Sequence, residues 1–130
     1  MYDDRRQFKR IPSYVIARVR ILIPEETFSP FMHEAVIVDI SERGMKLKTM
    51  DIDEATYKML LSSTRMVRVT FTPPEMDTAH TMFGKIVWID YNNLGRVPVT
   101  HYGISFEKPS ELDLQMVHLC IRALSDETKV

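Results

Sequence analysis

The chain has little of what most enzymes and membrane proteins require. It contains one cysteine in 130 residues, so it can form neither an internal disulfide nor a cysteine-based zinc site. Its four glycines form no phosphate-binding loop. No apolar run approaches the roughly 20 residues that span a membrane, and the charged N-terminus lacks a hydrophobic signal segment. We therefore expect a cytoplasmic protein that does not insert into membranes.

Catalytic and metal-binding patterns are also missing. The four histidines have neither metal-ligand spacing nor a supporting catalytic motif. Nucleotide hydrolysis would need a cluster of metal-binding carboxylates or histidines, and the sequence offers none. The lone Cys120 lies in an apolar helical pattern that is typical of a buried structural thiol. The chain is therefore predicted not to be an enzyme and to use no metal or cofactor.

Charge is balanced overall but unevenly distributed. The net charge is −1, which does not predict binding to long nucleic acid. The first twenty residues nevertheless carry a local excess of +4. The residues concerned are Arg5, Arg6, Lys9, Arg10, Arg18 and Arg20, against Asp3 and Asp4. Small barrels can bind oligonucleotides through aromatic and basic residues together, and Phe8 and Tyr14 lie nearby, but the remaining chain lacks a basic stripe. A small anionic ligand fits this distribution better.

Apolar periodicity predicts a fold made mainly of strands. Alternating apolar and polar residues indicate six strands, at residues 14–23, 32–41, 45–49, 65–72, 80–91 and 98–107. A short helix is expected at 53–62. A longer amphipathic helix opens at a capping box formed by Ser110 and Asp113 and continues to about 125. Because closure removes exposed sheet edges, this pattern favours a small antiparallel barrel with a C-terminal helix.

The orientation of side chains in the second strand can be predicted from alternation. Asp39 and Ser41 are two residues apart, so they share a face, which we expect to be the outer one together with Ile37. The opposite set should face the core, namely Val36, Val38 and Ile40. Gly44 follows and is expected to adopt the positive φ of a tight turn.

Two short segments carry the chemistry. One runs Arg5-Arg6-Gln7-Phe8-Lys9-Arg10, and the other runs Asp39-Ile40-Ser41-Glu42-Arg43-Gly44. Guanidinium groups suit phosphate oxygens and the O6/N7 edge of guanine, whereas a carboxylate accepts from guanine N–H groups. Alone, the first could be a solvated basic arm and the second an ordinary hairpin turn. Together they predict a receptor for an anionic guanine nucleotide.

In this order and spacing, the two segments resemble the PilZ family of cyclic di-GMP receptors. The family pattern is Arg-x-x-x-Arg followed roughly thirty residues later by Asp/Asn-x-Ser-x-x-Gly, and the chain matches it at Arg6, Arg10, Asp39, Ser41 and Gly44. Further landmarks are Ile11-Pro12, the segment 84–88 and the segment 102–106, so the resemblance covers most of residues 5–107. It implies a six-stranded PilZ-like barrel with a C-terminal α-helix.

The resemblance also implies roles for these residues. Arg6 and Arg10 would clamp phosphate and guanine, Asp39 and Ser41 would contact the guanine edge, and Gly44 would keep the loop tight enough for the ligand to approach.

Several further residues are assigned beside the family motifs. In the family, an arginine just before the first motif residue accompanies an intercalated nucleotide dimer, so Arg5 predicts two cyclic di-GMP molecules per chain. Arg43 is a further candidate phosphate contact, or else it points to solvent. Lys46 and Lys48 are expected on a solvated strand face, with a ligand-facing role as the alternative. Two aromatic residues are expected in the core, Trp88 and Phe106.

The expected domain organisation has three parts. Residues 1–12 would form a flexible arm with the first motif, 13–125 the barrel with its helix, and 126–130 a polar tail. Ligand would order the arm over the barrel and change a surface that an unidentified effector protein reads. The alternative is a PilZ-like interaction module that binds no nucleotide, against which the intact motifs argue.

Overall fold

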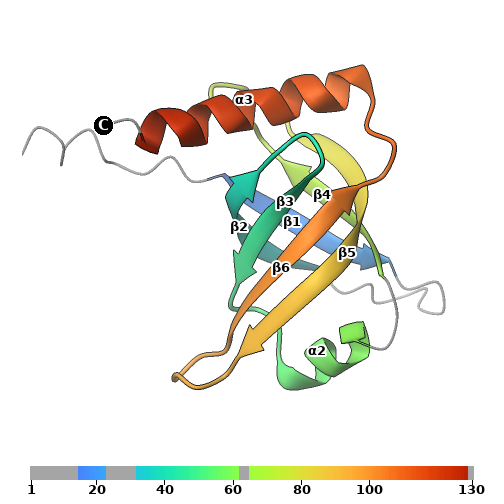
Figure 1. The fold of residues 1–130 in the computed structure, drawn as a ribbon, viewed down its shortest axis with the longest axis vertical. Helices are drawn as coiled ribbons and strands as arrows, with labels where there is room; N and C mark the ends of the chain where they lie inside the picture. Colours follow the sequence, from blue (N-terminus) through green and yellow to red (C-terminus); the bar gives the residue numbers. More distant parts are fainter. Residues whose placement is uncertain (1–14, 23–31, 62–64, 129–130) are drawn as a thin grey trace, which may run out of the picture.

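The computed structural model describes residues 15–22, 32–61 and 65–128, with side-chain environments up to residue 125. In this part of the chain, six strands form a closed antiparallel barrel in the order β1-β2-β3-β6-β5-β4 (Figure 1). The strands are β1 (Ile16–Leu22), β2 (Met32–Ile40), β3 (Gly44–Thr49), β4 (Met66–Phe71), β5 (His80–Asn92) and β6 (Val99–Phe106). The mainly β barrel predicted from the sequence is confirmed.

Two helices accompany the barrel, α2 (Glu54–Leu61) and α3 (Glu111–Thr128). Figure 1 shows them at opposite ends of it, with α3 lying across the end where β2 turns into β3. The predicted capping box of α3 is present: the Asp113 amide donates to Ser110 Oγ at 3.0 Å, and the Ser110 amide donates to Asp113 Oδ2 at 2.8 Å. These bonds satisfy two amide donors that a helix start would otherwise leave unpaired.

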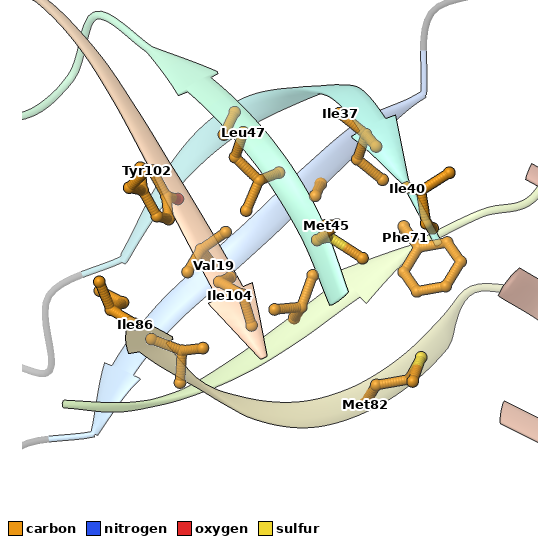
Figure 2. Packing of buried hydrophobic residues seen from close by; sticks show 14 of the residues in the cluster. Val19, Ile37, Ile40, Met45, Leu47, Phe71, Met82, Ile86, Tyr102 and Ile104 are labelled. Carbon is orange, nitrogen blue, oxygen red and sulfur yellow. The ribbon is translucent and has the colours of Figure 1, made fainter. Parts of the chain in front are cut away.

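The core fills the barrel with alternate side chains from every strand. In β1, Ala17, Val19 and Ile21 are fully buried, as their alternation predicts. Figure 2 shows Val19 packed among residues of the other strands, including Leu47 and Ile104. Burying one large aliphatic side chain stabilises the fold by roughly 1.5–3 kcal/mol, so this cluster is the main source of stability.

Helix α3 contributes a second layer to this core. Val117 and Cys120 are both fully buried, and burial raises the pKa of the Cys120 thiol to about 11. Because the thiolate is the reactive form, this cysteine is chemically inert at neutral pH. The predicted structural role of Cys120 agrees with this environment. Phe106 is also buried, as predicted.

A β-bulge in β2 overturns the predicted side-chain orientation for part of that strand. The pairing with β3 shifts register between Ile37 and Asp39. Ile37 therefore points into the core, whereas Val38 and Asp39 are both exposed and Ile40 is buried. The prediction that Val38 faces inward and Ile37 outward was wrong, because uninterrupted alternation was assumed. Asp39 does face outward, but only because the bulge adds one residue to the strand.

A second bulge, in β5, overturns the prediction for Trp88. The pairing of β5 with β6 shifts register between Ile86 and Trp88, so Val87 and Trp88 are consecutive exposed residues. Trp88 is 44% exposed on the outside of the barrel. The sequence favoured a core position because a large aromatic residue in an apolar run is usually buried.

Candidate functional site

The second motif forms the hairpin between β2 and β3. Asp39 lies just after the β2 bulge, and the Ser41 amide donates to the Gly44 carbonyl at 2.8 Å. The side chains of Asp39 and Ser41 each accept one local backbone bond: Asp39 Oδ1 from Ile40 at 2.9 Å, and Ser41 Oγ from the Arg43 amide at 3.2 Å. A carboxylate offers about four acceptor positions, so Asp39 keeps acceptor capacity for a ligand.

Gly44 is required at its position for a reason other than the one predicted. Among the described glycines none has a positive φ, so the expectation of a left-handed turn residue was wrong. A Cβ at Gly44 would instead collide with the backbone carbonyl oxygen of Ile104 on β6. Only glycine lets β3 approach β6 this closely, which keeps the end of the hairpin against the barrel wall.

A row of side chains crosses four neighbouring strands on the outer surface. Asp39 pairs with Lys46 on β3, Lys46 pairs with Gly103 on β6, and Gly103 pairs with Trp88 on β5. A shallow recess of about 390 Å³ lies along this row. Its lining includes Asp39, Ser41, Arg43, Lys46, Trp88 and Gly103. The structure thus gathers the second motif and an exposed tryptophan around one hollow.

The indole of Trp88 lies over Gly103, where no side chain stands between it and the strand. A Cβ at Gly103 would be 2.6 Å from Trp88 Cε2 and 2.8 Å from Cδ1, so any larger residue would displace the ring. Lys46 Nζ is 5.9 Å from the ring centroid, at the outer limit of a cation–π contact. The site therefore combines a flat aromatic surface, a nearby cation and, across the row, a carboxylate.

Trp88 was predicted in the core and not beside the second motif, and Lys46 was predicted to face a ligand only as the alternative to a solvated position. The sequence does indicate a bulge at this point. In the run Ile86-Val87-Trp88-Ile89 four consecutive residues are apolar, so the alternation of a regular strand is interrupted, as it is at a β-bulge. The glycine opposite Trp88 could be identified only from the strand pairing, which alternation within one strand does not reveal.

The motif hairpin also contacts the C-terminal helix. Glu42 Oε2 lies 2.6 Å from His118 Nε2 on α3, and both side chains are at least half exposed. The hairpin that presents Ser41 and Arg43 is therefore linked to α3 by a side-chain pair. The predicted arm residues Arg5, Arg6 and Arg10 lie outside the described residues, and their roles remain predictions.

No group of three or more His, Cys, Asp or Glu side chains among the described residues is arranged to hold a metal ion. Neither helix described here is long and apolar enough to cross a membrane.

Comparison with solved structures shows the same fold in larger proteins. MrkH from K. pneumonia matches with a TM-score of 0.64 and 16% identity, over 92% of this chain and 48% of MrkH. PlzA from Borreliella burgdorferi, solved in complex with c-di-GMP, matches with a TM-score of 0.50 and 10% identity, over 98% of this chain and 48% of PlzA. The Bacillus subtilis inhibitor of motility, MotI/DgrA, matches with a TM-score of 0.50 and 16% identity, over 88% of this chain and 52% of MotI/DgrA.

The chain thus spans about half the length of the solved structures it matches. At these identities the likeness shows a shared fold. No match was found among curated protein sequences. The family model of the PilZ domain, however, matches residues 4–123, which is nearly the whole chain. The chain therefore belongs to the PilZ domain family.

Proposed function

We propose that this PilZ domain is a receptor for cyclic di-GMP that transmits ligand binding to an effector protein and catalyses no reaction. The main support for this proposal is that Asp39, Ser41 and Trp88 line the same recess on the outer surface of the barrel. PlzA, which shares the fold, was solved with c-di-GMP bound, and this supports the choice of ligand.

The groups around the recess match the chemistry of a guanine nucleotide. The Asp39 carboxylate can accept from the guanine N1–H and N2–H donors, and the Ser41 hydroxyl can donate or accept beside it. The exposed face of Trp88 can stack on a base, which contributes roughly 1–3 kcal/mol in other nucleic-acid sites. Lys46 and Arg43, which also line the recess, can offset phosphate charge.

The N-terminal arm would complete the site. In this proposal Arg6 and Arg10 clamp phosphate and guanine, and ligand orders residues 1–12 over the barrel. Each charge-assisted hydrogen bond contributes roughly 1.5–3 kcal/mol, and about four or five such bonds together oppose the cost of ordering the arm. Arg5 would stack on a base of a second nucleotide, so that two ligands bind per chain.

Calorimetric titration with cyclic di-GMP tests the proposal, with GTP and cyclic di-AMP as controls. Asp39→Ala should weaken binding at least about tenfold, because it removes the side-chain oxygens that accept from the guanine donors. Asp90→Ala is the matched control, since Asp90 is exposed on β5 and does not line the recess. Arg6→Ala and Arg10→Ala should abolish binding, whereas Arg96→Ala, at an exposed loop position, should not.

The outcomes separate the components of the proposal. Equal affinity of Asp39→Ala and Asp90→Ala would remove the guanine-edge role. Normal binding by Arg6→Ala would show that the arm is not the clamp. Two ligands per chain, falling to one in Arg5→Ala, would support the dimer prediction. If the wild type binds none of the nucleotides at high concentration, the domain is an interaction module without a nucleotide ligand.

A further inference from the structure

Three arginines gather on the opposite side of the barrel from the nucleotide recess. Arg18 and Arg20 point outward from β1, and Arg68 points outward from β4, alternating with buried residues on both strands. In the barrel order, β1 lies across from β6 and β4 across from β3, the two strands at the centre of the recess described above. These arginines therefore cannot contact a ligand held by Trp88.

The strand pairing brings like charges face to face. Arg20 is directly opposite Arg68 in the β1–β4 pairing. Arg18 is opposite Thr70, and this pair is the next one on the same face of the sheet. Like charges at directly opposed positions destabilise a sheet. The arrangement is unfavourable unless an anion lies between the guanidinium groups.

Counter-charge is scarce around this cluster. Within the part of the chain that the structure describes, none of the three arginines forms an ion pair with a carboxylate. Glu34 is opposite Arg18 in the β1–β2 pairing, but no ion pair joins them. The Nε of Arg20 is buried and has no hydrogen-bond acceptor among the described residues. A buried charged donor without an acceptor is costly, so an anion that accepts from Arg20 would stabilise this cluster.

The cluster surrounds a hollow of suitable size. A recess of about 250 Å³ is lined by Arg18, Arg20, Arg68, Thr70 and Met32. This is smaller than the roughly 300–1,000 Å³ of pockets that hold drug-sized ligands. It suits a group with one or two tetrahedral centres. Planar guanidinium forks bind phosphate oxygens in pairs, and the Thr70 hydroxyl adds a donor.

We propose that this recess, formed by Arg18, Arg20 and Arg68, is a second anion site that binds a phosphoryl group. It is separate from the cyclic di-GMP recess and does not depend on the function proposed above. The phosphoryl group can belong to a free phosphate compound or to a phospholipid headgroup. The site also accounts for two of the six basic residues in the N-terminal charge excess, Arg18 and Arg20.

Titration of the protein with inorganic pyrophosphate tests the site, at constant ionic strength and followed by NMR. The side-chain Nε–H signals of Arg20 and Arg68 should shift in a saturable manner. Arg20→Gln and Arg68→Gln should each weaken binding by about tenfold or more, because each removes a charge-assisted pair of bonds. Arg122→Gln is the matched control: Arg122 is an exposed arginine on α3, outside the recess, and its loss should leave the affinity unchanged. Arg20→Gln should also retain the wild-type affinity for cyclic di-GMP.

A second arm identifies the source of the phosphoryl group. Phosphatidylcholine vesicles with and without phosphatidylglycerol would be tested in sedimentation assays. Binding that requires both phosphatidylglycerol and Arg20 assigns a lipid headgroup, whereas binding of pyrophosphate alone assigns a free phosphate compound. Equal weakening by Arg20→Gln and Arg122→Gln would show diffuse attraction and overturn the proposal. The absence of any Nε–H shift in the wild type, together with no Arg20-dependent vesicle binding, would overturn it without relying on any variant.

Discussion

Trp88 lies over Gly103, its partner on the adjacent strand, in an arrangement that only glycine permits. A methyl group at position 103 would overlap the indole, so Gly103→Ala must move the ring off its strand. The exposed aromatic surface beside Asp39 therefore depends on a residue that has no side chain.

The first prediction concerns this glycine. Gly103→Ala should lower the affinity for cyclic di-GMP by about tenfold, because the displaced ring no longer offers a flat surface to a base. The free energy of unfolding should fall by roughly 1–3 kcal/mol from overpacking. Calorimetry and chemical denaturation measure the two effects, and the shift of tryptophan fluorescence reports the ring movement.

Gly95→Ala is the control for that variant. A Cβ at Gly95 would meet nothing within 4 Å, so its stability should change by no more than about 0.5 kcal/mol. If Gly103→Ala and Gly95→Ala bind cyclic di-GMP equally well, the position of the Trp88 ring does not matter for the ligand.

The second prediction concerns the tryptophan itself. Trp88→Leu should weaken cyclic di-GMP binding by roughly 1–3 kcal/mol, the size of a lost stacking contact. Phe83→Leu removes an equally exposed aromatic ring from the same strand, outside the recess, and should leave binding unchanged. Calorimetric titration compares the two variants. A similar loss in both would point to a general effect on β5.

The third prediction is a pH dependence of stability that arises inside the barrel. His33 is buried with its Nε2 2.5 Å from the Tyr102 hydroxyl, and burial lowers the pKa of His33 from 6.5 to about 4, despite an opposing effect of Asp51. The folded state thus holds the proton less tightly than the unfolded state. The stabilising contribution is complete above pH 6.5 and is lost as the pH falls towards 4, by roughly 3 kcal/mol in total.

Denaturation of the wild type and of His33→Gln between pH 7.5 and 4 measures this contribution. Glutamine can still hydrogen-bond to Tyr102 but does not titrate, so the variant should lose less stability on acidification. Burial acts to raise the pKa of Asp113, but hydrogen bonds from the Ser110 amide and from His80 outweigh it and lower that pKa. Carboxylates such as this one titrate in both proteins and cancel in the difference. Parallel stability curves would contradict the prediction.

The fourth prediction concerns the contact between the motif hairpin and α3. Glu42 and His118 are 61% and 50% exposed, so their pairing should stabilise the fold by only about 0.2–1 kcal/mol. The two side chains carry opposite charges only when His118 is protonated. A double-mutant cycle with Glu42→Gln and His118→Gln in mildly acidic buffer, where an imidazole is protonated, measures the coupling energy, which should shrink in high salt. Lys58→Gln is the control, because it breaks an exposed pair within α2 that is separate from this contact. It should leave the coupling energy between Glu42 and His118 unchanged. A coupling that does not change with salt would exclude an ion pair.

Much of this protein could be predicted from local sequence patterns. The alternation of Ala17, Val19 and Ile21 with polar neighbours identified β1, and Ser110 with Asp113 identified the start of α3. Such features depend on residues close together in the chain, and the physics that produces them is local. The order and spacing of the two motifs likewise indicate the PilZ family from the sequence alone.

Other features were decided by strands that are distant in sequence. Alternation alone placed Val38 inward and Trp88 in the core, and two bulges reversed both because pairing with a neighbouring strand shifts the register. The need for glycine at position 44 likewise comes from the backbone of β6, about sixty residues away in the chain. Residues close together in the chain thus specify which elements form and which chemical groups they carry. Which of those groups share a surface depends on the register between strands, and that register is set by contacts between distant parts of the chain.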